Sequence, residues 1–412
     1  MLKKIVLFIL IFSANVFAQD GVVKDFLFKN DYGINSFIRW EKEPLISGQY
    51  LLLAPQSSLN YIKYKSKIIC WDLEQRNVVW HKKFKEEIKN IYCTSNAFFI
   101  GLNNKIIALS NKDGNTLWMR KFNNEITSNI ISTKKQIIVF ENKQDMFYNI
   151  DLKTGKITNK AKAIGLKDEK NQMDLNILPV NNQRVLLFLR EKLFLFDNFK
   201  KVWSYKFRSD YFPAITLDTI SKKNEPHLII TNFRTLYYIN VTNGNVKYKV
   251  SLDDNYYNIE PFIFKGSPNF LANYDRGAVI YLNSKLDKLW EFYNPANSEA
   301  PSTWAKLFTV FMKIRYNFTG EPLIKDNIII TQAGGRIYLL NMNGDEKNKI
   351  DLIPHDNNLF NSYIEAKYPL FFYKDYLIAI TSNIAGKITD KDNPGKFEVS
   401  DYIFYIKKQL LQ

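Results

Sequence analysis

The residue types that most often catalyse reactions or bind metals are few and scattered in this 412-residue chain. It contains two cysteines, Cys70 and Cys93, and three histidines, His81, His227 and His355. A zinc site is typically built from closely spaced pairs of these residues, and no such pair occurs. The spacing therefore predicts no zinc site. The two thiols either form one disulfide or lie as free thiols within the apolar segments that contain them.

Segment 390–395, DKDNPG, superficially resembles a calcium-binding loop. Pro394 stands where such a loop needs an oxygen ligand, and no glutamate follows at the required distance. We therefore interpret the segment as a long hairpin turn. Glycine-rich phosphate loops and nucleophile elbows are also absent from the sequence, whereas a pair of carboxylates distant in sequence remains open. We expect no catalytic residue, no metal site and no cofactor.

The first residues have the features of an export signal. Lys3 and Lys4 precede a short apolar run, and Val16 and Ala18 occupy the −3 and −1 positions of a cleavage site. This pattern predicts a signal peptide over residues 1–18, followed by a lead-in over residues 19–32. No cysteine near the cleavage site offers a point for lipid attachment, and no later apolar run is long enough to span a bilayer.

The chain is strongly basic, with a formal net charge of +16. An excess of this size favours anionic partners, such as membrane head groups, acidic glycans, an acidic protein face or nucleic acid. The positive charges are spread along the sequence and not gathered in one block. Compositional drift in a chain rich in Lys, Asn and Ile is therefore the alternative explanation.

One sequence frame recurs along most of the chain. In each copy an apolar run ends in Asp, Asn or Ser, which we call the anchor, and a polar turn follows. KIIALSNKDGNTLW has its anchor at Ser110, Gly114 four positions later and Trp118 eight positions later. The anchors are residues 72, 110, 151, 197, 240, 283 and 341, and the first six are separated by 38, 41, 46, 43 and 43 residues. A period of this length is typical of a repeat architecture.

Each part of the frame has a structural explanation. The anchor side chain can accept hydrogen bonds from the turn backbone, and the glycine supplies a positive φ. The aromatic residue presents a large apolar surface to the neighbouring repeat. Within one repeat, short apolar runs predict four strands, over residues 90–95, 97–101, 105–110 and 116–122. Four-stranded units of this period, arranged radially, form a β-propeller.

The frame resembles the repeat of the PQQ-like quinoprotein propellers, whose blades carry an ALDxxTGKxxW pattern. The segments KIIALSNKDGNTLW and NIDLKTGKIT are the closest copies, and three repeats have Asn159, Tyr248 and Asn348 in place of the tryptophan. A WD40 propeller is excluded because no histidine follows a glycine and the Trp-Asp pair occurs once, at Trp71 and Asp72.

The repeats predict an all-β fold, an eight-bladed β-propeller of four-stranded antiparallel blades over residues 33–412. We expect the third strands near Ile69, Ile107, Phe147, Leu195, Tyr238, Tyr281, Leu339 and Phe404. The last repeat stops after its third strand, and GINSFIRWEKE (33–43) is similar to an isolated fourth strand with Trp40 in the tryptophan position. The N-terminal strand is therefore expected to complete the last blade and remove its open edge.

Eight blades closed in this way resemble the B-component (BamB-like) propeller of the outer-membrane β-barrel assembly machinery. The resemblance implies an exported, non-catalytic scaffold that docks on the POTRA domains of the barrel subunit. It also implies that the scaffold helps unfolded outer-membrane proteins to reach the assembly site. Members of that family are lipoproteins, and the missing lipobox cysteine is a departure from the pattern.

The resemblance also implies a docking surface. In the family's docking loop, between blades three and four, this sequence has KAIGLKDEK, with Ile164, Leu166 and Lys167 in the matching positions. Asp210 is the nearest match to the acidic residues of the next inter-blade loop. Solvated turns are the alternative interpretation of both segments.

The seventh repeat contains an insertion with helical periodicity. The anchors at 283 and 341 are 58 residues apart, and residues 300–316 predict an amphipathic helix that begins at Ser302 or Thr303. Its apolar stripe comprises Trp304, Leu307, Phe308, Phe311 and Met312. This helix either docks on a protein partner or a membrane surface, or packs on the propeller itself.

The sequence thus predicts a periplasmic scaffold that acts as a monomer outside its complex and assists outer-membrane protein assembly. Association of the scaffold with the outer membrane stays open. Its expected contacts are a protein partner and, peripherally, an anionic membrane surface, but no nucleic acid. A propeller that binds another protein or an acidic glycan is the first alternative. A PQQ-dependent dehydrogenase is the second, although Cys70 and Cys93 do not form the vicinal pair often found in that class.

Overall fold

The structure is a computed structural model of the chain. It describes residues 21–30, 36–38, 45–53, 55–57, 66–86, 88–126, 130–132, 136–141, 143–163, 175–181, 183–189, 192–207, 214–218, 225–232, 235–251, 256–274, 278–293, 322–333, 335–352, 362–366, 370–385 and 398–411. Within these ranges there is no helix with the length and hydropathy that a bilayer crossing requires.

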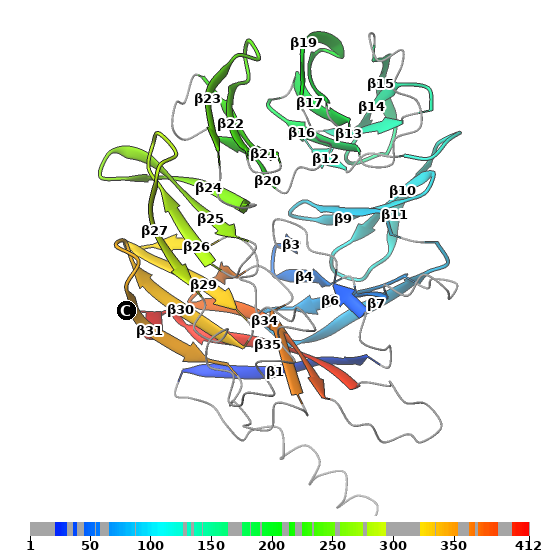
Figure 1. The fold of residues 1–412 in the computed structure, drawn as a ribbon. Helices are drawn as coiled ribbons and strands as arrows, with labels where there is room; N and C mark the ends of the chain where they lie inside the picture. The colour runs from blue at the N-terminus through cyan, green and yellow to red at the C-terminus, as the bar shows by residue number, and fades with distance from the viewer. Residues whose placement is uncertain are drawn as a thin grey trace, which may run out of the picture.

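Eight antiparallel blades form a propeller ring, as the repeats predict (Figure 1). Blade 1 comprises β3 (Ile46–Ser47), β4 (Tyr50–Leu53), β6 (Ser66–Asp72) and β7 (Asn77–Phe84), and blade 2 comprises β8 (Asn90–Cys93), β9 (Ala97–Leu102), β10 (Lys105–Ser110) and β11 (Thr116–Lys121). Blade 3 comprises β12 (Ile131–Ser132), β13 (Gln136–Glu141), β14 (Met146–Asp151) and β15 (Ile157–Lys162), and blade 4 comprises β16 (Leu175–Pro179), β17 (Arg184–Leu189), β18 (Lys192–Asp197) and β19 (Lys200–Lys206).

The remaining blades complete the ring. Blade 5 comprises β20 (Ala214–Asp218), β21 (His227–Asn232), β22 (Thr235–Asn240) and β23 (Val246–Ser251), and blade 6 comprises β24 (Tyr256–Phe264), β25 (Ser267–Tyr274), β26 (Ala278–Leu282) and β27 (Lys288–Tyr293). Blade 7 comprises β28 (Leu323–Lys325), β29 (Ile328–Ala333), β30 (Arg336–Asn341) and β31 (Glu346–Asp351), and blade 8 comprises β32 (Ser362–Ala366), β33 (Phe371–Tyr373), β34 (Tyr376–Ala385), β35 (Glu398–Lys407) and β1 (Val22–Asn30). A 3-10 turn, Lys408–Leu411, ends the described chain. All eight predicted third strands are confirmed.

The hydrophobic core is divided among the interfaces between blades. Eight clusters of buried side chains each join residues of two neighbouring blades. One of them packs Leu52, Cys70 and Trp80 of blade 1 against Phe98 and Ile107 of blade 2. Because each blade buries apolar side chains on both faces, stability depends on every neighbour being in place, as in other repeat folds.

The N-terminal segment closes the ring, but the closing strand differs from the predicted one. β1 pairs antiparallel with β35, from Val22 opposite Ile406 to Asn30 opposite Val399. The prediction that residues 33–43 form this strand is therefore wrong. Residues 36–38 (β2) pair instead with β5 (Pro55–Ser57) in a separate two-stranded sheet. The closing strand thus lies in the segment that we expected to be a lead-in.

The error has a physical cause. The tryptophan frame depends on a short turn between the third and fourth strands, and in blade 8 these strands come from opposite ends of the chain. No turn therefore fixes the spacing between the third strand and the fourth strand of blade 8, and the position of Trp40 does not identify the fourth strand. Burial and hydrogen bonding select β1 instead, because Val22 lies in the core between blades 7 and 8 and the Lys407 amide donates to the Gly21 carbonyl at 2.9 Å.

The predicted turn chemistry is confirmed. The anchors Asp72, Asp151, Asn240, Asn283 and Asn341 accept hydrogen bonds from backbone amides two to four residues further along. Ser110 and Asp197 are the exceptions. In the Ser110 turn Asp113 accepts from the Asn115 amide at 3.1 Å, and Asp197 accepts from the side chains of Arg184 and Asn198. A register shift follows each of these turns, as expected for a bulged hairpin.

Tryptophan on the outermost strand locks a blade to the next one. Trp80 donates its indole N–H to the Asn111 carbonyl at 2.9 Å, and Trp118, Trp203 and Trp290 make the equivalent bond at 3.0 Å. The receiving turns contain Gly114, Gly155, Gly244 and Gly344, all with positive φ. A Cβ atom at any of the four would lie 2.6–2.7 Å from the tryptophan ring. Each tryptophan thus requires a glycine in the following blade.

Blades 3 and 5, which lack this tryptophan, use the reverse arrangement. Blade 3 has Asn159 at the position, and Phe199 in the turn of blade 4 stacks on Phe147 of blade 3 at 5.1 Å between ring centroids. Blade 5 has Tyr248, and Leu286 in the turn of blade 6 packs into the core of blade 5. Both turn residues have positive φ. A bulky turn residue therefore fills the space that the tryptophan fills elsewhere.

Candidate protein-interaction surface

Alternation of strand direction gives the propeller two distinct faces. The hairpins that join second to third strands and the connections between blades emerge on one face, which we call the connection face. The turns that contain the anchors emerge on the opposite face, which we call the turn face. All the interaction segments predicted from the sequence are connections between blades, so their flanking strands end on the connection face.

The predicted docking residues themselves lie outside the described residues. Ile164, Leu166 and Lys167 follow β15 and Ala163 of blade 3 and precede β16 of blade 4. Asp210 falls between β19 and β20, in the next connection around the ring. The flanking strands thus confirm the inter-blade position of both segments, while the roles of these residues remain predictions.

The predicted helical insertion also lies outside the described residues. Residues 300–316 fall between β27 of blade 6 and β28 of blade 7. Trp304, Leu307, Phe308 and Phe311 belong to this segment. The connection therefore has the predicted place in the ring, and its proposed docking role remains untested.

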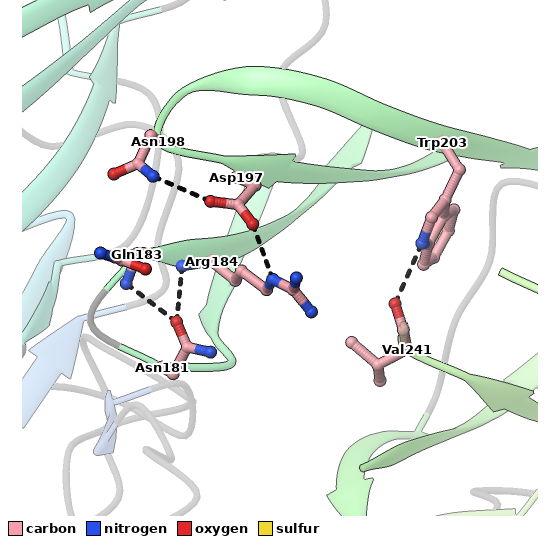
Figure 2. Close-up of polar contacts among 7 residues, drawn as sticks. All are labelled: Asn181, Gln183, Arg184, Asp197, Asn198, Trp203 and Val241. Atoms are coloured by element: carbon pink, nitrogen blue, oxygen red, sulfur yellow. Dashed lines mark hydrogen bonds and ion pairs between the residues drawn. The ribbon is translucent and has the colours of Figure 1, made fainter. Parts of the chain in front are cut away.

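The turn face of blade 4 is ordered by a charged pair (Figure 2). The Arg184 guanidinium donates to the Asp197 carboxylate at 2.8 Å, and the Asn198 amide donates to the other oxygen of Asp197 at 3.0 Å. The Asn181 side chain accepts from the Gln183 and Arg184 amides at 2.9 Å. Both oxygens of Asp197 are therefore used structurally, which leaves this carboxylate poorly suited to bind a ligand.

The junction between blades 8 and 1 has its own polar contacts. The Trp71 indole N–H donates to the Tyr405 hydroxyl at 2.8 Å, and the Arg76 guanidinium lies 4.7 Å from the centroid of the Tyr405 ring. The Tyr373 hydroxyl donates to Glu74 at 2.9 Å. Arg76 has a positive φ of 55° at the turn position where other blades have glycine. This turn receives no tryptophan, because β1 carries none.

One histidine lies in a buried polar cluster. His227 stacks on Tyr238 at 4.5 Å between ring centroids, and the Tyr238 hydroxyl donates to Asp218 at 2.8 Å. Asp218 and His227 are both almost fully buried. The cluster is closed to solvent, so we assign it to the packing of blade 5 and not to catalysis.

The anchor carboxylate of Asp151 predicts a specific acid sensitivity. Hydrogen bonds from the Thr154 side chain and amide lower the pKa of Asp151. A carboxylate with a lowered folded-state pKa contributes stability above its unfolded pKa of about 4, and this contribution is lost as the pH falls through the folded-state value. We expect Asp151→Asn to retain the turn, because asparagine serves as the anchor in three other blades, and to weaken the decline in thermal stability below about pH 4. Melting curves between pH 7 and pH 3 measure this. An unchanged acid decline in the variant would contradict the assignment.

Cys70 and Cys93 are not joined in a disulfide. Cys70 is fully buried, and this burial, followed by the charge of Asp72, raises its pKa to about 12. A thiol in this environment is a poor nucleophile. We expect a thiol reagent at pH 8 to modify the half-buried Cys93 in the native protein and to modify Cys70 only after unfolding. Mass spectrometry of the labelled protein measures this, and rapid native labelling of Cys70 would contradict it.

The described part of the chain offers no evident metal site. No group of three His, Cys, Asp or Glu side chains there is placed to hold an ion.

Comparison with known proteins follows the fold and the repeats. A family model described as "Outer membrane protein assembly factor BamB" matches residues 39–194, which extend from before blade 1 into blade 4. The crystal structure of BamB from Moraxella catarrhalis has 13% sequence identity and a TM-score of 0.52, over 91% of this chain and 99% of that chain. Among curated proteins, no relative matches.

Enzymes share the same architecture. A europium-containing methanol dehydrogenase has 11% identity and a TM-score of 0.56, over 93% of both chains. The dihydro-heme d1 dehydrogenase NirN has 8% identity and a TM-score of 0.56, over 93% of this chain and 80% of that chain. At such low identities these similarities establish the fold and leave the activity open.

The repeats, the eight blades and the family match together define a PQQ-repeat β-propeller. Within that class the chain is similar to BamB, through the family model over residues 39–194 and through the fold of the Moraxella catarrhalis structure.

Proposed function

We propose that this protein is an exported, non-catalytic scaffold that assists the assembly of outer-membrane β-barrel proteins. The observation that carries the proposal is the match of residues 39–194 to the outer membrane protein assembly factor BamB, in a chain whose complete ring has the BamB architecture. The proposed partner is the set of POTRA domains of the barrel-assembly subunit. The proposed location is the periplasm, at the outer membrane.

The connection face is the proposed docking surface. Ile164, Leu166 and Lys167 combine two aliphatic side chains with one positive charge, and Asp210 belongs to the next connection around the ring. Apolar anchors with a few charged neighbours are typical of protein interfaces. The partner would therefore present an apolar groove with an acidic group beside it.

A pull-down from detergent-solubilised envelope with the tagged mature protein tests the docking proposal. The variant Ile164→Ala/Leu166→Ala/Lys167→Ala is expected to lower recovery of the barrel-assembly subunit by about tenfold or more, since truncating interface anchors costs upward of 1 kcal/mol each. The matched control is Lys112→Ala/Lys153→Ala/Lys285→Ala, which alters three exposed residues on the turn face. Equal recovery with both variants would contradict the proposed docking site.

The insertion is tested separately by deleting residues 300–316. If the helix docks, the deletion lowers recovery of a partner while the melting temperature is retained. If it packs on the propeller, the melting temperature falls instead. Recovery of no barrel-assembly subunit by any form of the protein would contradict the proposed function itself.

A PQQ-dependent dehydrogenase is the second candidate, favoured by the shared fold of the methanol dehydrogenase. Protein purified from its natural envelope and denatured would then release a quinone with its characteristic absorbance, together with a stoichiometric metal ion. We expect neither, and recovery of both would replace the scaffold proposal.

A further inference from the structure

The outermost strands of the propeller carry charge very unevenly. β7, β11, β15, β19 and β23 belong to five consecutive blades and follow one another around the rim (Figure 1). They contain eleven basic residues and no acidic residue. The basic residues are Lys82, Lys83, Arg120, Lys121, Lys160, Lys162, Lys200, Lys201, Lys206, Lys247 and Lys249. We call this part of the rim the basic arc.

The rest of the rim is nearly balanced. β27 carries Lys288 and Glu291, which form an ion pair at 3.0 Å. β31 carries two lysines and two acidic residues, and β1 carries two lysines and one aspartate. Compositional drift would enrich lysine everywhere, but it would not remove acidic residues from five strands in succession. Acidic residues make up 41 of the 412 residues, so their absence from these five strands departs from the composition of the chain as a whole.

Protection of sheet edges explains only part of this pattern. Lysine on an outer strand discourages pairing with other chains, and the strands outside the arc also contain lysine. Edge protection does not require that acidic residues be absent. Binding of an anionic partner explains the absence of acidic residues, because each acidic side chain would repel the partner and would neutralise a neighbouring lysine.

Exposed aliphatic side chains accompany the charges in blades 1 and 2. Val78 and Val79 of β7 are 42% and 38% exposed, and Leu117 and Met119 of β11 are 55% and 50% exposed. Lys83 and Lys121 are exposed on the same two strands. Lys82 and Arg120 are turned toward the next blade, where they donate to the carbonyls of Gly114 and Gly155. The outer strands of blades 1 and 2 therefore present aliphatic groups among lysines.

We propose that the rim at β7 and β11 binds the surface of an anionic lipid bilayer. Lysines near such a surface are attracted to its head groups, and exposed aliphatic side chains enter the boundary between head groups and acyl chains. The rim is convex and a bilayer is nearly flat, so contact is confined to neighbouring blades. The flanking strands β15 and β19 extend the positive field on one side.

Nucleic acid fits this surface less well. Single strands are usually bound by stacking of bases on exposed aromatic rings, whereas Trp80 and Trp118 are each only 9% exposed and pack against glycine. An acidic protein would satisfy the lysines, but the apolar anchors of a protein interface cluster at its centre, whereas these four aliphatic side chains are distributed among lysines over two outer strands. The combination of charges and aliphatic groups therefore favours lipid.

Sedimentation with vesicles tests the proposal on the mature protein without any partner protein, so the result is independent of the proposed docking. Vesicles of phosphatidylglycerol and phosphatidylcholine are compared with vesicles of phosphatidylcholine alone. We expect binding only to the anionic vesicles, weakened by salt. Lys83→Gln/Lys121→Gln should lower the partition coefficient roughly tenfold to thirtyfold. The control Lys347→Gln/Lys349→Gln alters two exposed lysines of β31 and should leave it unchanged.

The aliphatic contribution has a matched pair of its own. Leu117 and Leu289 are bulge residues of the outer strands of blades 2 and 6, and they are 55% and 53% exposed. Leu117→Ser should lower binding about tenfold, whereas Leu289→Ser should not. Equal effects in both members of either pair, equal binding to neutral vesicles, or absence of vesicle binding would each overturn the proposal. So would binding of a single-stranded oligonucleotide, sensitive to the Lys83 and Lys121 changes, without vesicle binding.

Discussion

A protein that begins at residue 33 is expected to be less stable than one that begins at residue 19 by about 5 kcal/mol or more, and to associate with itself. This truncation removes β1, which is the fourth strand of blade 8. Val22 would leave the core between blades 7 and 8, and one side of β35 would lose its backbone partners from Val399 to Ile406. The loss combines burial of apolar surface with several hydrogen bonds, and the exposed edge is then open to other chains.

Thermal unfolding and size-exclusion chromatography of chains that begin at residues 19 and 33 measure this effect. A peptide that covers residues 19–32 should raise the melting temperature of the truncated chain, because it can restore the missing strand. A peptide with the same composition in scrambled order is the control. Equal melting temperatures for the two chains would show that β1 does not close the ring.

Gly155→Ala is expected to lower the free energy of unfolding by about 3 kcal/mol. Gly155 has a φ of 65°, where an L-residue is strained by about 1–2 kcal/mol. The added Cβ would also lie 2.6 Å from two atoms of the Trp118 ring. Moving the ring threatens its hydrogen bond to the Leu152 carbonyl and the packing between blades 2 and 3, and overpacking of this kind typically costs about 1–3 kcal/mol.

Gly266→Ala is the matched control for the strain that an L-residue suffers at a positive φ. Gly266 has a φ of 75°, and an added Cβ there would meet nothing within 4 Å. Chemical denaturation should show a loss of about 1 kcal/mol for this variant. In a double-mutant cycle, Gly155→Ala should cost less in a Trp118→Ala background, because the ring is already absent. Similar losses of unfolding free energy for Gly155→Ala and Gly266→Ala would show that the Trp118 ring is not tightly packed against Gly155.

The repeat frame was visible in the sequence because its chemistry is local. An anchor such as Asp151 accepts hydrogen bonds from amides two and three residues away, and Gly155 supplies the backbone geometry that the same turn requires. The four strands predicted over residues 90–122 agree with β8 to β11 to within two residues. Contacts of such short range leave a pattern of fixed spacing, which a single sequence reveals.

The coupling between blades was not evident in advance. Trp118 requires Gly155, while Phe199 replaces a tryptophan that blade 3 lacks. Each pair joins residues of different blades, separated in sequence by the length of a repeat. The frame indicated that an aromatic residue faces a neighbour, but it could not show which neighbour supplies the space.

The candidate interaction surfaces were also predicted in part by the sequence and decided in part by the tertiary structure. The positions of the predicted docking segments between blades followed from the repeat count, because connections must lie where one repeat ends and the next begins. The lysines of the basic arc were present in the sequence, yet they are spread over residues 82–249 with acidic residues between them. Only the ring brings the five outermost strands to one continuous part of the rim.

Turns, strand number and the need for a closing strand were thus determined by the sequence alone, because short-range hydrogen bonding and apolar periodicity dictate them. The identity of the closing strand, the matching of tryptophan to glycine and the continuity of the basic arc were decided by the tertiary structure. These features depend on which distant segments pack together, and that choice is made by the summed burial and pairing of the whole ring.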